Sequence, residues 1–201
     1  MSDENNENGN KVIFLGESNV GKTNLMRISV GKPFDFHSMS TWSVSYLPKN
    51  FIYNNRTYIF NLWDTIGQET YRSLTKIFFK NAIIVLLIYD ITSRKTFEEL
   101  EFWYQQVKNE LGDEFLLAIV GNKKDLFIDM KVTEEEGKKY ADEKGAKFKL
   151  SSAKDDPMDF TQFLEDLLKE SIEKNYSTIN KPRGLSILPK KSEKNKKCCS
   201  S

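Results

Sequence analysis

Short apolar runs alternate along the chain with stretches in which apolar residues recur at helical spacing. The runs at residues 83–89 and 115–120 are continuously apolar, as strands buried on both faces of a parallel sheet require. Residues 11–15 form a similar run that leads into a glycine-containing loop, and residues 147–150 are a shorter, less apolar candidate. We therefore expect these segments to form strands of one sheet.

Two further strands are predicted from a turn signal. Residues 51–53 and 58–63 flank the pair Asn54-Asn55. Asparagine tolerates the positive φ angles that tight hairpin turns need. The sequence therefore predicts an antiparallel hairpin.

Apolar residues recur every three or four positions in segments typical of helices, at residues 25–30, 96–111, 134–144 and 160–172. Thr133 and Glu136 match a capping box at the start of the third helix. Strands that alternate with helices favour a parallel, doubly wound sheet. We expect an α/β fold, with a mostly parallel sheet of about six strands flanked by helices on both faces.

The chain length of 201 residues fits one domain with tails. Residues 1–10 are polar and predicted to be disordered. The predicted domain spans residues 11–173, and residues 174–201, rich in lysine and interrupted by prolines, are predicted to be a flexible tail. The longest apolar run, residues 82–89, is too short to span a bilayer, and the N-terminus lacks the features of a secretory signal.

Charge and cysteine content add little to this picture. The net charge of +1 does not indicate nucleic acid as a partner, and we expect none. The only cysteines, Cys198 and Cys199, are adjacent near the end of the chain and cannot cross-link the fold, so a reducing cytosolic setting is the simplest expectation. His37, the only histidine, is expected to be a solvated loop residue without a catalytic role.

The first candidate for chemistry is residues 16–23, G-E-S-N-V-G-K-T, which match the pattern G-x-x-x-x-G-K-[ST] between a predicted strand and helix. Backbone N–H groups of such a loop and the helix N-terminus attract phosphate oxygens. Its lysine is expected to reach the β- and γ-phosphates and its threonine to ligate magnesium. The predicted phosphate-binding residues are Ser18, Asn19, Val20, Gly21, Lys22, Thr23 and Asn24. A chance glycine turn is the alternative, and kinases and ATPases share the pattern.

Two later motifs select the base and the chemistry. Residues 122–125 read N-K-K-D directly after a predicted strand, and predict Asn122, Lys123 and Asp125 as nucleotide contacts. The aspartate can accept hydrogen bonds from guanine N1–H and the 2-amino group, whereas adenine would leave it buried and unpaired. Residues 64–68 read D-T-I-G-Q. In that motif we expect Asp64 to hold magnesium through a water, Gly67 to contact the γ-phosphate and Gln68 to orient the attacking water.

With these motifs in register, the chain resembles a Ras-superfamily small GTPase, and most of all the Rab family, over residues 11–172 and again at the C-terminal cysteines. The Rab-like stretches are W-D-T-I-G-Q-E at residues 63–69, T-Y-R-S-L-T at residues 70–75 and L-I-Y-D-I-T at residues 87–92.

This resemblance implies a GTP/GDP switch that uses Mg²⁺, hydrolyses GTP slowly and regulates vesicle-mediated membrane traffic from the cytoplasmic face of an intracellular membrane. The alternatives are a Ras- or Rho-like signalling GTPase, a hydrolysis-impaired GTP-binding scaffold and a P-loop kinase, the last disfavoured by N-K-K-D and D-T-I-G-Q.

The resemblance also assigns residues that no local pattern identifies. Thr41 would bind magnesium and the γ-phosphate, and Phe34 would pack edge-on against guanine. Ser152, Ala153 and Lys154 match the last guanine-contacting motif. The implied catalytic set is Gln68, Lys22 and Thr41, and the implied magnesium set is Thr23, Thr41 and Asp64. Tyr46, Trp63 and Phe78 fall where Rab proteins carry an aromatic triad for effectors, with simple core packing as the alternative.

Some positions depart from the family pattern. Residues 40–46 read S-T-W-S-V-S-Y where Rab proteins usually have S-T-I-G-V-D-F, which bears on effector identity. Ile66 replaces a usual alanine, and its β-branched side chain stiffens a loop that must move on hydrolysis. Asn19 stands where small residues dominate. The last two departures bear on the rate of hydrolysis rather than on binding.

The tail ends in a lysine-rich segment, residues 190–197, followed by C-C-S-S. This ending resembles Rab C-termini that carry geranylgeranyl groups, which implies lipidation at Cys198 and Cys199. It also loosely fits a C-a-a-X signal with Cys198 as acceptor, although neither following residue is aliphatic. Stable anchoring needs two lipids, or one lipid plus a basic patch. A solvated basic end is the alternative. The implied partners are an exchange factor, a GTPase-activating protein, effectors at the switch regions, and an escort or extraction carrier that binds the apolar residues Leu185 and Ile187.

Overall fold

The computed structural model describes residues 10–37, 45–65 and 79–174 of the chain. These residues form a six-stranded sheet in the order β2-β3-β1-β4-β5-β6, in which only β2 and β3 pair antiparallel. The strands are β1 (Asn10–Leu15), β2 (Ser45–Tyr53), β3 (Arg56–Asp64), β4 (Ala82–Asp90), β5 (Leu116–Asn122) and β6 (Lys147–Leu150). The predicted fold class is therefore confirmed.

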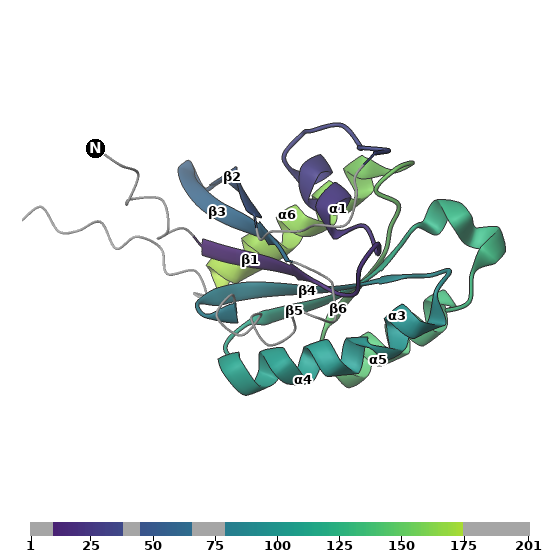
Figure 1. Ribbon diagram of the computed structural model, residues 1–201. Helices are drawn as coiled ribbons and strands as arrows, with labels where there is room; N and C mark the ends of the chain where they lie inside the picture. The colour runs from purple at the N-terminus through teal and green to yellow at the C-terminus, as the bar shows by residue number, and fades with distance from the viewer. Residues whose placement is uncertain (1–9, 38–44, 66–78, 175–201) are drawn as a thin grey trace, which may run out of the picture.

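Helices cover both faces of the sheet (Figure 1). One face is covered by α1 (Lys22–Ser29) and α6 (Pro157–Glu173), and the other by α3 (Arg94–Glu98), α4 (Leu100–Leu111) and α5 (Glu134–Glu143). Each layer has its own apolar core, and β4, buried along its whole length, contributes to both. Among the described residues, no helix has the length and hydropathy of a membrane span.

The hairpin and the capping box are confirmed. Asn54 and Asn55 have φ angles of 50° and 57°, which gives the tight turn that the twist of paired strands favours. At α5, the Thr133 hydroxyl accepts from the Glu136 backbone N–H at 3.2 Å, and the Glu136 carboxylate accepts from the Thr133 N–H at 2.9 Å.

Three helix boundaries differ from the predicted ones. The helix expected at residues 96–111 begins at Arg94 and is divided at Glu99, where ψ is −10° instead of the helical value of about −42°. Helix α1 starts at Lys22, before the predicted start at residue 25, because its polar first turn shows no apolar periodicity from which a helix could be predicted. Helix α6 starts at Pro157, after the Asp156 side chain accepts from the Asp159 N–H at 3.1 Å.

One element was not predicted. A short 3₁₀ helix, η2 (Lys124–Asp129), follows β5. It is too short for a periodic pattern to reveal it, and it holds three exposed apolar side chains, Leu126, Phe127 and Ile128.

Candidate nucleotide site

The loop between β1 and α1 depends on two glycines. Gly16 has a φ of 140°, and a Cβ atom there would lie 2.1 Å from the Ile88 carbonyl oxygen. Gly21 has a φ of 97°, and a Cβ atom there would lie 2.3 Å from Asn122 Nδ2. Asn19, between them, has a φ of 63° and is exposed, a conformation that asparagine adopts more readily than most residues. The loop therefore packs backbone against β4 and against the N-K-K-D segment.

Lys22 is buried at the start of α1. Its Nζ donates to the Gly16 carbonyl at 2.9 Å and to the Glu17 carbonyl at 2.7 Å, so the ammonium lies beneath its own loop. Burial lowers the pKa of Lys22 from 10.5 to about 8, although the charges of Asp64 and Glu17 act in the opposite direction. A desolvated ammonium at this place interacts strongly with an incoming anion, because little water screens it.

Thr23 and Asp64 lie together, as the predicted magnesium site requires. The Thr23 hydroxyl donates to Asp64 Oδ2 at 2.6 Å, and Asp64 at the end of β3 is fully buried. A hydroxyl beside a carboxylate offers hard oxygen ligands of the kind that Mg²⁺ binds, together with phosphate oxygens and waters. Within the described ranges no group of three His, Cys, Asp or Glu side chains could hold a metal ion. The two residues fit a magnesium–phosphate complex.

Asn122 joins the phosphate loop to residues 152–154, S-A-K. Its Nδ2 donates to the Val20 carbonyl at 2.8 Å, and its Oδ1 accepts from the Ala153 N–H at 3.2 Å. Both ends of the buried amide are therefore used within the protein, and the residue acts as a tie between two loops.

The predicted base-recognition residues also come together. The Ser152 hydroxyl donates to Asp125 Oδ1 at 2.6 Å and accepts from the Asp155 N–H at 3.0 Å. Lys154 Nζ lies 4.0 Å from Asp125 Oδ2. The Asp125 carboxylate is thus oriented by a segment 27 residues later in the chain.

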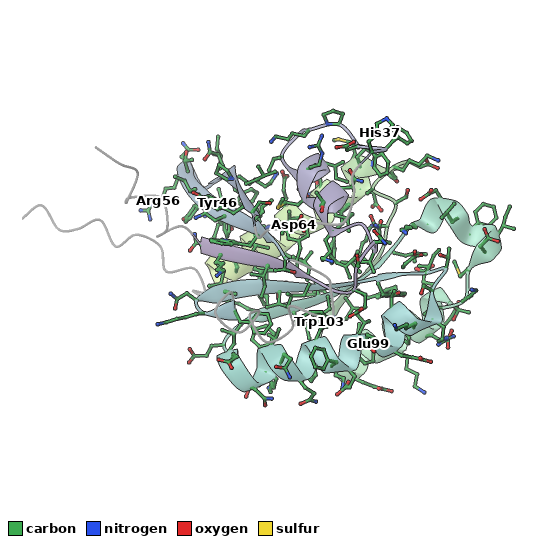
Figure 2. The ribbon with its side chains drawn as sticks, viewed as in Figure 1. His37, Tyr46, Arg56, Asp64, Glu99 and Trp103 are labelled. Atoms are coloured by element: carbon green, nitrogen blue, oxygen red, sulfur yellow. The ribbon has the colours of Figure 1, made fainter. Side chains whose placement is uncertain are left out.

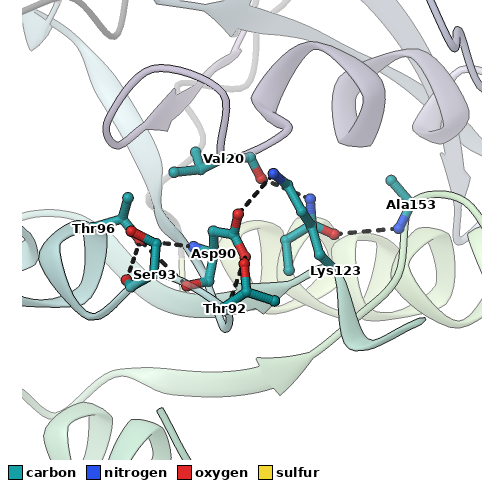
Figure 3. Close-up of polar contacts among 8 residues, drawn as sticks. Val20, Asp90, Thr92, Ser93, Thr96, Lys123 and Ala153 are labelled. Carbon is teal, nitrogen blue, oxygen red and sulfur yellow. Dashed lines mark hydrogen bonds and ion pairs between the residues drawn. The ribbon is translucent and has the colours of Figure 1, made fainter. Parts of the chain in front are cut away.

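A contact that the sequence analysis did not assign involves Asp90. Lys123, with a φ of 68°, places its Nζ 2.7 Å from Asp90 Oδ2 (Figure 3). The other Asp90 oxygen accepts from the Thr92 N–H and from the Thr92 hydroxyl, at 2.9 and 2.7 Å. Asp90 lies within the L-I-Y-D-I-T stretch, so its place in a recognised motif was the only available signal.

Two predicted nucleotide residues make contacts away from the loops described above. The Asn24 amide exchanges hydrogen bonds with the backbone of Asp35, at 3.1 and 2.8 Å, and so fixes the segment after α1. Phe34 is half-buried against the core and lies edge-on to Phe36, with ring centroids 4.9 Å apart. A third predicted nucleotide residue, Ser18, lies on the phosphate loop itself and is half-buried.

Tyr46 and Trp63 stack across the β2–β3 pair, with ring centroids 5.1 Å apart. Tyr46 is 38% exposed, so it does not simply fill the core. Lys11 Nζ lies 4.4 Å from the Trp63 ring. The remaining predicted residues lie outside the described residues: Thr41, Ile66, Gly67, Gln68, Phe78, Leu185, Ile187, Cys198 and Cys199.

Comparison with known proteins agrees with this arrangement. The Ras family model matches residues 11–173. Ras-related protein RABA1b of Arabidopsis thaliana is 36% identical over 143 residues, and Ras-related protein RGP2 of Oryza sativa subsp. japonica is 34% identical over 143 residues. Each match covers 71% of this chain and 66% of the relative, just under two thirds of the relative's length. The chain therefore belongs to the Ras family of small GTPases and is most like the Rab proteins, as its motifs predicted.

Proposed function

We propose that this chain is a Rab-like GTP/GDP switch that binds nucleotide with Mg²⁺, hydrolyses GTP slowly and regulates vesicle-mediated membrane traffic. The observation that carries the proposal is the base site, where the Asp125 carboxylate accepts from Ser152 at 2.6 Å. The Asn122 amide ties the same region to the phosphate loop. Base recognition and phosphate binding are therefore expected to belong to one connected site.

The chemistry follows from the family and from the residues present. Ras-family proteins in general hydrolyse GTP and use Mg²⁺ with the nucleotide. Here Thr23 would hold the ion directly and Asp64 through a water, and the ion would neutralise charge on the phosphates. Lys22 would contact the β- and γ-phosphates. Thr41, Gly67 and Gln68 are proposed to bind the γ-phosphate side, with Gln68 orienting the attacking water.

Slow hydrolysis is proposed because the segment around Thr41, the first switch region of the family, supplies no arginine. The residues before Thr41 are Ser38, Met39 and Ser40. An arginine supplied by an activating protein can raise the rate by about 10³- to 10⁵-fold. Gln68→Leu should lower single-turnover hydrolysis while leaving GTP binding intact. Turnover by the purified protein alone at about one per second or faster would contradict the proposal, since unassisted small GTPases are far slower.

Partners and membrane attachment are part of the same proposal. The exposed Tyr46, stacked on the partly buried Trp63, supports an effector contact beside the switch regions. The two terminal cysteines, Cys198 and Cys199, are proposed to carry prenyl groups, with Leu185 and Ile187 read by an escort or extraction carrier. Mass spectrometry of the protein from its native membrane tests this directly, and absence of lipid on both cysteines would remove the anchor.

Guanine specificity has the sharpest test. Chromatography of the nucleotide that copurifies with the protein should identify GDP or GTP. Asp125→Asn should shift preference from guanosine to xanthosine nucleotides, because the new amide can donate to the 2-keto group. Asp129→Asn, an exposed acid of the same η2 helix, is the matched control and should leave preference unchanged. Equal affinity of the unmodified protein for ATP and GTP would overturn guanine recognition.

A further inference from the structure

Glu17 is a buried acid that neither phosphate binding nor base recognition uses. It is the second residue of the phosphate loop and only 7% exposed. Trp103 Nε1 donates to Glu17 Oε1 at 3.2 Å, from a position 86 residues later in the chain. An ionised side chain is rarely buried without a bonded partner, and an indole N–H usually has one when buried.

The contact joins the two layers of the molecule. Trp103, 1% exposed, projects from α4 toward the sheet (Figure 2) and belongs to the core that α4 and α5 cover. Lys22 begins α1, which packs on the opposite core. Glu17 is held from both sides, because its carboxylate accepts from Trp103 while its carbonyl accepts from Lys22 Nζ at 2.7 Å.

This geometry links the α4 core to the lysine that meets the phosphates. A carboxylate held by a buried indole fixes the Glu17 side chain, and with it the orientation of the backbone carbonyl that positions Lys22. Hydrogen bonds to a charged acceptor are among the strong ones, so loss of the indole donor removes one strong restraint on the Glu17 carboxylate. A less restrained Glu17 would loosen the loop at its first residues.

We propose that Trp103 is a positioning residue for the phosphate loop: its indole N–H holds Glu17, and loss of that donor speeds dissociation of the bound nucleotide. The inference rests on the proposed function, because it assumes that a guanine nucleotide occupies this loop. Trp103 itself touches no phosphate in this scheme and acts through Glu17.

The experiment measures dissociation of a fluorescent GDP analogue from the full chain in the presence of magnesium. Trp103→Phe keeps an aromatic ring but lacks the donor, and should dissociate about tenfold faster, as loss of one charge-assisted bond implies. Glu17→Met, which lacks the acceptor, should give a similar rise. Glu17→Gln keeps a side-chain oxygen and should give a smaller rise than Glu17→Met.

A matched control separates positioning from packing. Val107 lies one turn after Trp103 on α4, is fully buried in the same core and has no hydrogen-bonding group in its side chain. Val107→Ala should lower thermal stability through a cavity yet leave the dissociation rate unchanged. The double variant Trp103→Phe, Glu17→Met should dissociate no more than about threefold faster than either single variant, since both remove the same bond.

The outcomes are distinguishable. If the unmodified protein binds no guanine nucleotide, the proposed function fails and this inference fails with it. If it binds nucleotide but Trp103→Phe dissociates at the rate of Val107→Ala, only the positioning role is overturned. Multiplicative effects in the double variant would also overturn it. Should Trp103→Phe fail to fold, the dissociation rates of Glu17→Met and Glu17→Gln test the proposal instead. Equal dissociation rates in those two variants would refute the role of the Glu17 acceptor.

Discussion

Replacing Ser152 by alanine tests whether base recognition depends on the orientation of Asp125. The substitution removes one oxygen atom and two hydrogen bonds, the donation to Asp125 Oδ1 at 2.6 Å and the acceptance from the Asp155 N–H at 3.0 Å. Asp155 is exposed, so water can replace the acceptor that its N–H loses. The Asp125 side chain is only 10% exposed, so the bond that it loses is harder to replace.

The size of the effect follows from that bond. A hydrogen bond to a charged acceptor contributes about 1.5–3 kcal/mol, and each 1.4 kcal/mol is a factor of ten in affinity. If the whole contribution appears in binding, the Kd for GDP rises by about tenfold to a hundredfold. Lys154, 4.0 Å from the other Asp125 oxygen, is too far away to fix the carboxylate in place of Ser152.

The neighbouring residue supplies the control. Ser151 is 1% exposed, and its hydroxyl has no hydrogen-bond partner within the described part of the chain. Its backbone carbonyl accepts from the Lys124 N–H at 2.9 Å, and an alanine keeps that bond. Ser151→Ala should therefore leave GDP affinity unchanged and be neutral or slightly stabilising, because a buried polar atom without a partner is lost.

Competition of GDP against a fluorescent GDP analogue, with magnesium in excess, measures both variants under one condition. Xanthosine diphosphate and adenosine diphosphate belong in the same series, because Asp125 is expected to recognise the base. If Ser152→Ala binds GDP within about threefold of Ser151→Ala, a difference smaller than a hydrogen bond to a charged acceptor contributes, the orientation of Asp125 by Ser152 is not what confers affinity.

Three further predictions concern the loop and the helix caps. Because the pKa of Lys22 is lowered from 10.5 to about 8, its charge is lost as pH rises through about 8, and the phosphate affinity that depends on this charge is lost with it. The effect on the stability of the nucleotide-free protein has the opposite sign: between pH about 8 and 10.5 the unfolded chain binds more protons at this group, so stability rises with pH. Titration calorimetry should show this loss of GDP affinity, and Lys22→Arg should flatten the profile, since arginine does not titrate there. Gly16→Ala, whose Cβ would lie 2.1 Å from a β4 carbonyl, should lower the free energy of unfolding in urea by more than about 3 kcal/mol. Gly145→Ala, with a φ of 65° but no atom within 4 Å, should lower it by about 1 kcal/mol. Equal losses of stability in the two variants would contradict the close approach at Gly16. Thr133→Ala should cost about 1 kcal/mol while Thr133→Ser costs little, and a Ser variant as unstable as the Ala variant would rule out the capping box as the reason.

The strands were predictable because burial on both faces leaves a continuous apolar run. Strand β4, buried along its whole length, is the clearest example, and the Asn54-Asn55 turn identified the hairpin. The start of α1 was missed because its first turn carries polar residues that serve the phosphate loop. The start of α6 was missed because Met158 is exposed and Pro157 only partly buried, so neither continues the apolar pattern that faces the core. Periodicity reports burial, so it is silent wherever a helical residue faces a ligand site or solvent.

The contiguous motifs of the site were predictable for a related reason. A phosphate loop binds through successive backbone N–H groups, so its glycines, its lysine and its threonine must be adjacent in sequence. The same holds for N-K-K-D, whose residues follow one another at the end of β5. The sequence could not show which side chains hold these motifs in place, because those partners come from other elements and have no fixed spacing.

Asn122 has a second role that its motif did not reveal. The pattern predicts a contact with nucleotide, which stays a prediction, and in the structure the amide also joins the Val20 carbonyl to the Ala153 N–H. Glu17 and Asp90 are ordinary acids in the sequence that contact Trp103 and Lys123 in the structure. Asp90 pairs with Lys123, a predicted nucleotide contact, and Trp103 holds Glu17, whose carbonyl accepts from Lys22. Substitutions at Trp103 or Asp90 should therefore change nucleotide affinity and exchange more than the chemical step, whereas substitutions at Gln68 should do the reverse.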